Sequence, residues 1–314
     1  MKFFNKKYFP LFLISFLCFA LLFSFVQCHF GNPSEVNDSD TISDPIETYS
    51  LLKTDSMHGI TIISLTENNP LTVRENILQY EIPETTFESK KTKFYSLLNA
   101  LQVLYTFSEP NIYNIVDSMN YLAAYYLQNL LEDTKSLYSP IKHAMLSITT
   151  SPDKKLRVFS WDENAGMTFK THLNVFQFQT KEGQLKSCLN ESMESEDDFN
   201  FIHAQIKHFY KLPSTNSNIL YLSLFQGLSC RTCHFKGVTA IEIINDSLNF
   251  HYPLFNDSLS YLIFNYSEND ICTLSFNPKS TSLHYTLIQK NEDNNDTISE
   301  RFIFKNNFFY KQDD

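Results

Sequence analysis

The sequence predicts an α+β fold in which an N-terminal helical hairpin packs on a large antiparallel β-meander, built as a sandwich or a half-barrel. Three observations predict this fold. Apolar residues recur at helical spacing over two neighbouring stretches before Pro140. After Pro140 the spacing changes to the alternation that is typical of strands. Short turns rich in Asn, Asp, Ser and Pro separate the alternating runs, which favours strands that follow one another in the sheet.

The chain begins with an export signal, which we assign to residues 1–27. An almost uncharged apolar run from Phe9 to Val26 follows three lysines, Lys2, Lys6 and Lys7. Three outcomes stay open: lipidation of Cys28 after cleavage, which we favour; ordinary signal cleavage; and retention of the run as a membrane span, for which about 18 apolar residues are enough. Phe25-Val26-Gln27 departs from the small residues that precede the cysteine of a bacterial lipobox.

A polar stretch follows the signal. Residues 31–54 are rich in Asn, Ser, Asp, Pro and Glu, with few large apolar side chains. Such a segment buries too little surface to offset its loss of conformational entropy, so we expect residues 28–58 to be a flexible tether. A β-prone run from Gly59 to Ile63 opens a mainly helical region, residues 59–144.

Two apolar stripes predict the helical hairpin. The first contains Phe94, Leu97, Leu98, Leu101, Leu104 and Tyr105. The second contains Ile112, Ile115, Val116, Met119, Leu122, Ala123, Tyr126, Leu130 and Leu131. Glu109-Pro110-Asn111 ends the first helix and supplies an N-cap for the second. This spacing is more typical of core packing than of a ligand groove.

The region 145–314 is predicted to be antiparallel β. The alternating runs are 145–149, 156–161, 173–179, 184–189, 219–225, 238–244, 248–252, 261–266, 272–276, 283–289, 302–305 and 308–310. Residues 200–212 fit either a strand or a helix, and we interpret them as a strand. With only six glycines in the chain, the turns must depend on Asn, Asp, Ser and Pro.

Charge restricts the partners. The chain has a formal net charge of −10, and loss of the three signal lysines lowers it to −13. Such an acidic protein repels nucleic acid and anionic lipid headgroups, so nucleic acid is excluded as a partner. The remaining partners are the membrane, through the N-terminal lipid anchor, and a carbohydrate or protein ligand on exposed tyrosines of the sheets.

Cysteine usage predicts disulfides. Besides Cys18 and Cys28, the chain holds Cys188, Cys230, Cys233 and Cys272. In an exported protein these four predict two disulfides, in any of three pairings.

Cys230-Arg231-Thr232-Cys233-His234 matches C-x-x-C-H, the attachment sequence for c-type haem. Covalent haem would use both sulfurs and His234 as an iron ligand. The motif lies in a predicted loop, 227–237, between two β runs, whereas haem attachment favours the end of a helix. A redox-active thiol pair is the other functional interpretation, although neither a helix N-terminus nor a βαβ pattern flanks it. We therefore favour a loop closed by a disulfide, and expect no cofactor.

The sequence provides no complete catalytic or metal-binding motif. G-x-S-x-G, S-x-x-K, H-E-x-x-H and phosphate-binding glycine loops are all missing. His203 and His208 have a spacing that suits no shared face, and the acidic residues 191–198 lack the pattern of a calcium loop. No catalytic or metal-ligating residue is therefore predicted.

Residues 151–162, which read Ser-Pro-Asp-Lys-Lys-Leu-Arg-Val-Phe-Ser-Trp-Asp, carry a resemblance. They resemble the S-P-D-G-K-x-R-x-Y-S-W-D segment of uncharacterised exported lipoproteins of Gram-negative bacteria. In that group a glycine-rich element follows Trp-Asp, and Ala165-Gly166-Met167-Thr168 matches it in part. The resemblance implies the lipoprotein class and no known activity, with Trp161 as a packing anchor.

Asp followed by Ser or Thr and then an aliphatic residue or Met resembles the acceptor pattern of bacterial O-glycosylation. We expect Ser247 and Ser258 to be the first candidates for glycans. Taken together, the sequence predicts an exported, membrane-anchored lipoprotein at the periplasm or cell surface that acts by binding or structural interaction. An exported hydrolase and a c-type haem protein are the alternatives.

Overall fold

The computed structural model describes residues 53–57, 60–64, 84–106, 112–164, 170–189, 203–214, 218–255, 259–290 and 295–312. All of these lie in one compact unit, Ser50–Asp314. The predicted signal peptide, Cys28 and most of the expected tether fall outside the described residues. The tether expectation, residues 28–58, overlaps the strand β1 (Lys53–Met57), which pairs antiparallel with β2 (Ile60–Ser64).

Two helices follow β1 and β2 and precede the larger sheets, α3 (Phe87–Leu104) and α4 (Ile112–Leu131). Thr86 caps α3, because its hydroxyl accepts a hydrogen bond from the Ser89 backbone N–H at 3.2 Å and the Ser89 hydroxyl accepts one from the Thr86 N–H. The two helices contact each other along their length. A short 3₁₀ turn, η1 (Thr134–Leu137), follows α4 and is capped by Asp133.

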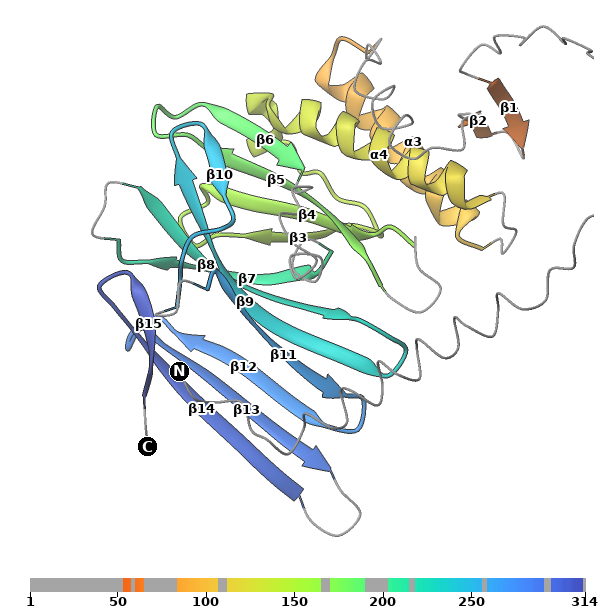
Figure 1. Cartoon of the computed structure of the whole chain (residues 1–314). Helices are drawn as coiled ribbons and strands as arrows, with labels where there is room; N and C mark the ends of the chain where they lie inside the picture. Colours follow the sequence, from red (N-terminus) through yellow and green to blue (C-terminus); the bar gives the residue numbers. More distant parts are fainter. Residues whose placement is uncertain are drawn as a thin grey trace, which may run out of the picture. The chain divides into compact units, whose positions relative to one another are not determined.

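The predicted antiparallel β structure is confirmed: after Pro140 the strands form three sheets, in which most neighbouring strands follow one another in sequence (Figure 1). The first sheet has the order β3-β4-β5-β6. Its strands are β3 (Ser147–Thr150), β4 (Leu156–Asp162), β5 (His172–Gln179) and β6 (Leu185–Leu189).

The second sheet has the order β10-β9-β8-β7, and β11 also pairs with β9. Its strands are β7 (Gln205–Leu212), β8 (Ile219–Leu228), β9 (Cys233–Ile244), β10 (Ser247–Asn249) and β11 (Tyr261–Ser267). The ambiguous segment 200–212 therefore does contain a strand. The third sheet has the order β12-β13-β14-β15. Its strands are β12 (Ile271–Asn277), β13 (Ser282–Lys290), β14 (Asn295–Lys305) and β15 (Phe308–Gln312).

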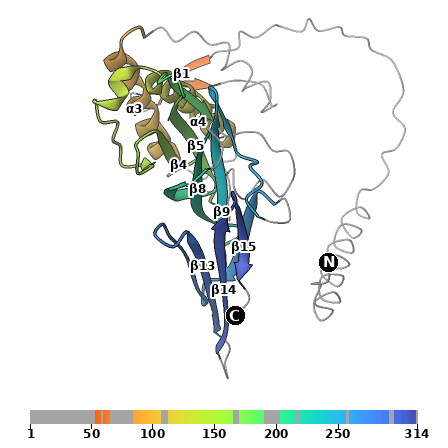
Figure 2. The ribbon, with the colours of Figure 1, turned by 90° about the vertical axis from the view of Figure 1, so that its left-hand side faces the viewer.

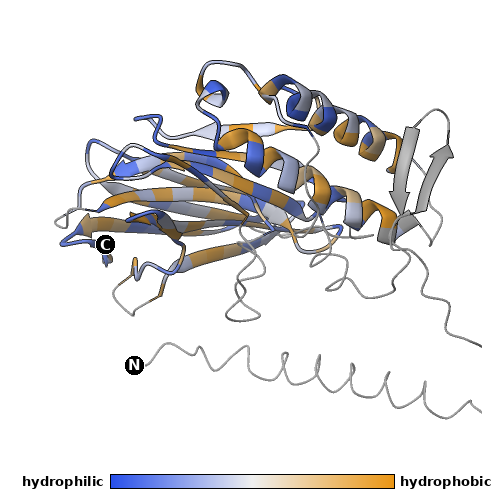
Figure 3. Ribbon diagram, turned by 90° about the horizontal axis from the view of Figure 1, so that it is seen from above, coloured by the Kyte–Doolittle hydropathy of each residue, from blue (hydrophilic) through white to orange (hydrophobic). Residues whose placement is uncertain are grey.

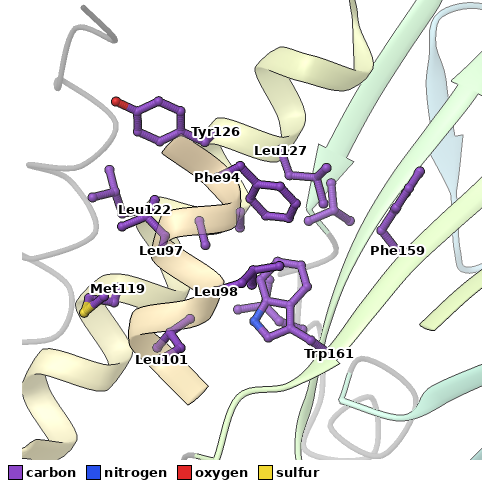
Figure 4. Packing of buried hydrophobic residues seen from close by; sticks show 14 of the residues in the cluster. Phe94, Leu97, Leu98, Leu101, Met119, Leu122, Tyr126, Leu127, Phe159 and Trp161 are labelled. Carbon is purple, nitrogen blue, oxygen red and sulfur yellow. The ribbon is translucent and has the colours of Figure 1, made fainter. Parts of the chain in front are cut away.

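Four successive layers follow from the apolar clusters. One face of the first sheet packs against the helices, and Figure 4 shows Phe159 and Trp161 pointing from this sheet toward the helical side chains. Its other face shares a cluster with β7, β8 and β9. The opposite face of the second sheet packs on the third sheet. Figure 2 shows this succession, with α3 and α4 near β4 and β5 at one end and β13, β14 and β15 at the other.

Burial explains the strand composition. Residues of β4, β5 and β8 are buried on both faces; β8 is mostly apolar, whereas β4 and β5 also bury polar side chains such as Ser160, Asn174 and Gln177. The strands β12 and β13 of the third sheet alternate between buried and exposed positions, because one face meets solvent. Figure 3 shows the apolar stretches along the inner strands and the polar residues at the turns.

The predicted loop 227–237 is wrong: both of its glycines lie within strands, and only residues 229–232 join β8 to β9. Phe235 lies opposite Gly227, and Phe225 lies opposite Gly237. A Cβ on Gly237 would stand 2.2 Å from the Phe225 ring and 2.7 Å from a backbone oxygen. The glycines are therefore needed so that the phenyl rings can cover the backbone, rather than to make a turn.

The Ser-Pro-Asp turn of the lipoprotein-like segment joins two sheets. The Asp153 carboxylate accepts hydrogen bonds from the Tyr221 hydroxyl at 2.9 Å and from Ser151, and pairs with Lys211 at 3.1 Å. Burial acts to raise the pKa of Asp153, but these hydrogen bonds hold it below its usual value. Lys154, at the position where the resembling segment has glycine, adopts a left-handed backbone with φ of 59°.

Candidate functional site

Polar residues from four parts of the chain lie where α4 meets the ends of β4 and β5, and we call Asp117, Glu163, Thr171 and His203 the carboxylate–histidine cluster. Asp117 lies on α4, Glu163 directly follows β4, Thr171 directly precedes β5, and His203 precedes β7. The cluster therefore collects groups from four separate parts of the chain, which is the usual construction of a functional site rather than of a local turn.

The pleat of the first sheet places Glu163 and Thr171 together. Trp161 pairs with Leu173, and two residues further on the Glu163 N–H donates to the Thr171 carbonyl at 3.0 Å. Side chains at alternate positions share a face, so Glu163 and Thr171 lie on the helix side of the sheet, as Trp161 does. Thr171 is 7% exposed, and its hydroxyl has no hydrogen-bond partner within the described part of the chain.

Asn120 of α4 fixes this end of β4. Its Oδ1 accepts the Trp161 Nε1–H at 2.8 Å and lies 3.1 Å from the Tyr105 hydroxyl. Its Nδ2 donates to the Glu163 carbonyl at 2.8 Å. The Tyr105 hydroxyl also lies 3.0 Å from the Asp162 carbonyl oxygen, and burial raises the Tyr105 pKa, so this hydroxyl stays protonated. This buried network positions Glu163 and leaves its carboxylate available for His203.

His203 pairs with Glu163, with Nδ1 3.0 Å from Oε1. The Glu163 side chain is 11% exposed and that of His203 29% exposed. Asp117 is half-buried, and burial first, then the negative charge of Glu163, raise its pKa to about 6. The cluster thus contains one carboxyl group that exchanges its proton near neutral pH and one carboxylate held by an imidazole.

His172 lies one residue after Thr171, on the opposite face of β5. Burial lowers its pKa, and its Nδ1 has no hydrogen-bond partner among the residues described. On the same face the Ser160 hydroxyl donates to Asn174 at 2.6 Å, and the Asn174 amide donates to the Ala204 carbonyl at 2.9 Å. This end of the first sheet is therefore polar on both faces, unlike its middle.

Of the two predicted disulfides, one is present. Cys230 and Cys233 are joined, whereas Cys188 and Cys272 are free. The second disulfide is not formed because Cys188 lies on β6 of the first sheet and Cys272 on β12 of the third, with the second sheet between them. Burial raises the pKa of Cys188 to about 12 and also raises that of Cys272, so both stay protonated thiols.

The C-x-x-C-H residues do not form a haem site in this structure. The disulfide uses the two sulfurs that thioether bonds would need, and the motif lies in a hairpin rather than at a helix end. The His234 ring stacks on the Tyr266 ring with a centroid distance of 5.3 Å, so packing on this tyrosine is a structural role for the imidazole.

Of the remaining predicted positions, Ser247 and Trp161 lie within the described residues, and Ser258 and Cys28 lie outside them. Ser247 is exposed in the β9–β10 turn, where its hydroxyl donates to the Ile244 carbonyl at 3.1 Å. Trp161 is 1% exposed, which agrees with a packing anchor and not with a surface aromatic.

Most tyrosines of the β region are buried or half-buried. Tyr221, Tyr252 and Tyr285 are buried, and Tyr310 on β15 is 36% exposed. The solvent face of the third sheet instead presents hydroxyl and charged groups, including Thr273, Ser275, His284 and Arg301. The described sheets therefore do not offer the aromatic face that the sequence led us to expect.

The carboxylate–histidine cluster follows from no pattern in the sequence. Asp117 sits within an apolar helical stripe, Glu163 follows a strand, and Thr171 and His203 belong to no motif. The available signal was the acidic pair Asp162-Glu163 directly after the tryptophan, because a carboxylate at the end of a buried strand needs a partner.

No known protein family matches the chain, and no curated protein sequence is significantly similar to it. In the part of the chain that the structure describes, no helix is long and apolar enough to cross a membrane. Nor do three His, Cys, Asp or Glu side chains of that part lie where they could share a metal ion.

Proposed function

We propose that this chain is an exported, membrane-anchored lipoprotein that binds a polar, hydroxyl-bearing ligand at the carboxylate–histidine cluster. The lysines followed by the apolar run 9–26 support export, and Cys28 supports a lipid anchor at the periplasm or cell surface. The acidic charge of the chain supports a neutral or cationic ligand, such as a carbohydrate or a protein segment, and argues against nucleic acid.

One observation carries the binding proposal: the Thr171 hydroxyl is buried at the end of the first sheet without a hydrogen-bond partner among the described residues, and the backbone of Thr171 is paired with that of Glu163. A buried hydroxyl without a partner costs free energy on the order of 1–3 kcal/mol, unless a ligand or water satisfies it. A sugar hydroxyl bound between Thr171 and the carboxylates would supply that partner. We further propose that α3 and α4 form one helical hairpin that covers the ligand, because Tyr105 and Asn120 connect both helices to the end of β4.

Trp161 provides a direct test, because it is the single tryptophan of the chain and it is hydrogen-bonded to Asn120. Titration with neutral oligosaccharides, and separately with a lysine-bearing peptide, should change its fluorescence in a saturable way. Glu163→Gln should weaken binding about tenfold or more, which corresponds to loss of one charge-assisted hydrogen bond. Glu182→Gln, at an exposed position in the β5–β6 turn, is the matched control and should bind as the wild type does.

Saturable binding that is unaffected by Glu163→Gln would place the ligand elsewhere and contradict the proposed site. Absence of any response across both ligand classes would contradict the proposed chemistry.

Hydrolysis is the second candidate, and the raised pKa of Asp117 favours it. A carboxyl group that is protonated near pH 6, together with a nearby carboxylate, is the combination that general acid–base hydrolysis of glycosides uses. Nitrophenyl glycosides provide the assay: turnover that Asp117→Asn abolishes and Asp246→Asn leaves intact would establish a hydrolase. Absence of turnover in a protein that still binds the ligand would support the binding protein over the hydrolase.

The anchor is tested separately. Metabolic labelling with a fatty acid should mark the wild-type protein, and Cys28→Ser should lose the label. An exported protein that carries no label would indicate ordinary signal cleavage instead of lipidation. An uncleaved N-terminus would indicate that the apolar run is retained as a membrane span.

A further inference from the structure

The tip of the β8–β9 hairpin presents the Cys230–Cys233 disulfide to solvent. Residues 229–232 join the two strands, and Arg231, Thr232 and Cys233 are exposed. Exposure of a sulfur is the first requirement for thiol–disulfide exchange, because the attacking thiolate must approach along the S–S axis.

The hairpin tip is held without this disulfide. The Ser229 N–H donates to the Cys233 carbonyl at 2.9 Å, and the β8–β9 ladder continues to the pair Leu228 and His234. On the other side, β11 pairs with β9 as far as Cys233, and the Glu268 N–H donates to the Thr232 carbonyl at 3.0 Å. A cross-link over such a short loop also removes little entropy from the unfolded chain. The disulfide is therefore not a main support of the fold.

Basic residues lie next to the two cysteines in sequence. Arg231 lies between the cysteines in sequence, and His234 follows directly. His234 stacks on the Tyr266 ring, whereas Lys236 lies over the same ring and donates to the Cys272 carbonyl, so its charge is directed at β12 rather than at the disulfide. Positive charge stabilises a thiolate and makes it a better leaving group. The other two described cysteines face apolar clusters, and burial raises the pKa of both thiols.

We propose that Cys230 and Cys233 form a redox-active pair that exchanges disulfides with a dithiol of a partner protein. A partner thiolate attacks Sγ of the exposed Cys233, a mixed disulfide forms, and Cys230 leaves as a thiolate that takes up a proton. The second partner thiol loses its proton and displaces Cys233, which becomes a thiol. The pair thereby gains two electrons and two protons, and the partner dithiol becomes a disulfide. This activity does not depend on the ligand of the carboxylate–histidine cluster.

The test uses the purified oxidised protein and a reduced model peptide with two cysteines. After mixing and quenching with iodoacetamide, mass spectrometry locates the alkylated cysteines, and circular dichroism follows the fold. The expected result is alkylated Cys230 and Cys233 in amounts equal to the oxidised peptide, with Cys188 and Cys272 unlabelled and the fold unchanged. Sulfurs that stay oxidised in the folded protein, or reduction that unfolds it, would overturn the proposal.

Variants separate exchange from a structural role. The double variant Cys230→Ser/Cys233→Ser should fail to oxidise the peptide and should keep the thermal midpoint of the wild type, whereas a large fall in the midpoint would show a structural brace and refute the proposal. Arg231→Glu should slow exchange severalfold, because it places a negative charge beside the residue whose thiolate must leave, Cys230. Arg301→Glu, an exposed arginine on the third sheet, is the matched control and should exchange at the wild-type rate.

Discussion

Replacing Asp117 by Asn should stabilise the protein near neutral pH and leave its stability nearly unchanged in acid. Burial and the charge of Glu163 raise the Asp117 pKa from 3.8 to about 6. Each pKa unit corresponds to about 1.4 kcal/mol, so the ionised carboxylate would cost about 3 kcal/mol if the group were fully buried. Because Asp117 is half-buried, solvent screening reduces this cost to about 1.5 kcal/mol.

The sign follows from the raised pKa. Below about pH 4 Asp117 is protonated in both the folded and the unfolded chain, so it does not lower the stability of the folded state. As the pH rises from 4 through 6, the unfolded chain releases the proton first, so the stability of the wild type falls. The asparagine of the Asp117→Asn variant has no proton to release, and the variant should therefore gain about 1.5 kcal/mol over the wild type between pH 4.5 and 7.5.

Urea unfolding followed by Trp161 fluorescence measures this difference at several pH values. Asp246→Asn, at an exposed position of the β9–β10 turn, is the control and should show no such pH dependence. A difference between Asp117→Asn and the wild type that stays constant from pH 4.5 to 7.5 would refute the reasoning. A wild type that is more stable than the variant at pH 7.5 would also refute it.

Three further substitutions test the packing, each by urea unfolding. Asn120→Ala should cost about 3 kcal/mol, because it leaves the buried Trp161 Nε1–H without an acceptor; a cost under about 1 kcal/mol would show that the network is dispensable. Lys154→Gly should stabilise by about 0.5–1 kcal/mol, since glycine accepts φ of 59° without strain, and a loss of stability would contradict this account of the turn. Gly237→Ala should cost about 2–3 kcal/mol or prevent folding, because its Cβ meets the Phe225 ring at 2.2 Å; wild-type stability would show that the ring moves freely.

Much of the fold was predictable from periodicity. The apolar stripe that starts at Ile112 and ends at Leu131 has the bounds of α4, and most strand predictions lie within a few residues of the observed strands. These elements have consistent local signals, because the same apolar residues that define the period also form the core. The division into three sheets was not predictable, since the pairing of β11 with β9 depends on contacts distant in sequence.

The candidate site was not predictable, for a related reason. Asp117, Glu163 and His203 come from a helix, a strand end and a loop, and none of them stands out among its sequence neighbours. Only the register of β4 with β5 and the packing of α4 bring them together. The loop 227–237 shows the opposite error, because glycine was interpreted as a turn signal where it serves to accommodate a phenyl ring.

The strand β8 is apolar on both faces, and this affects how its register with β9 is determined. In a strand with one solvent-exposed face, a register shift by one residue would expose the core residues and is strongly disfavoured. In β8 both faces are buried and apolar, so the shifted register would bury nearly as much apolar surface as the native one. The two glycine–phenyl pairs remove that ambiguity. A shift of β8 against β9 by one residue would place the Phe225 and Phe235 rings against side chains instead of glycine backbone. Gly227 and Gly237 therefore fix the register between β8 and β9.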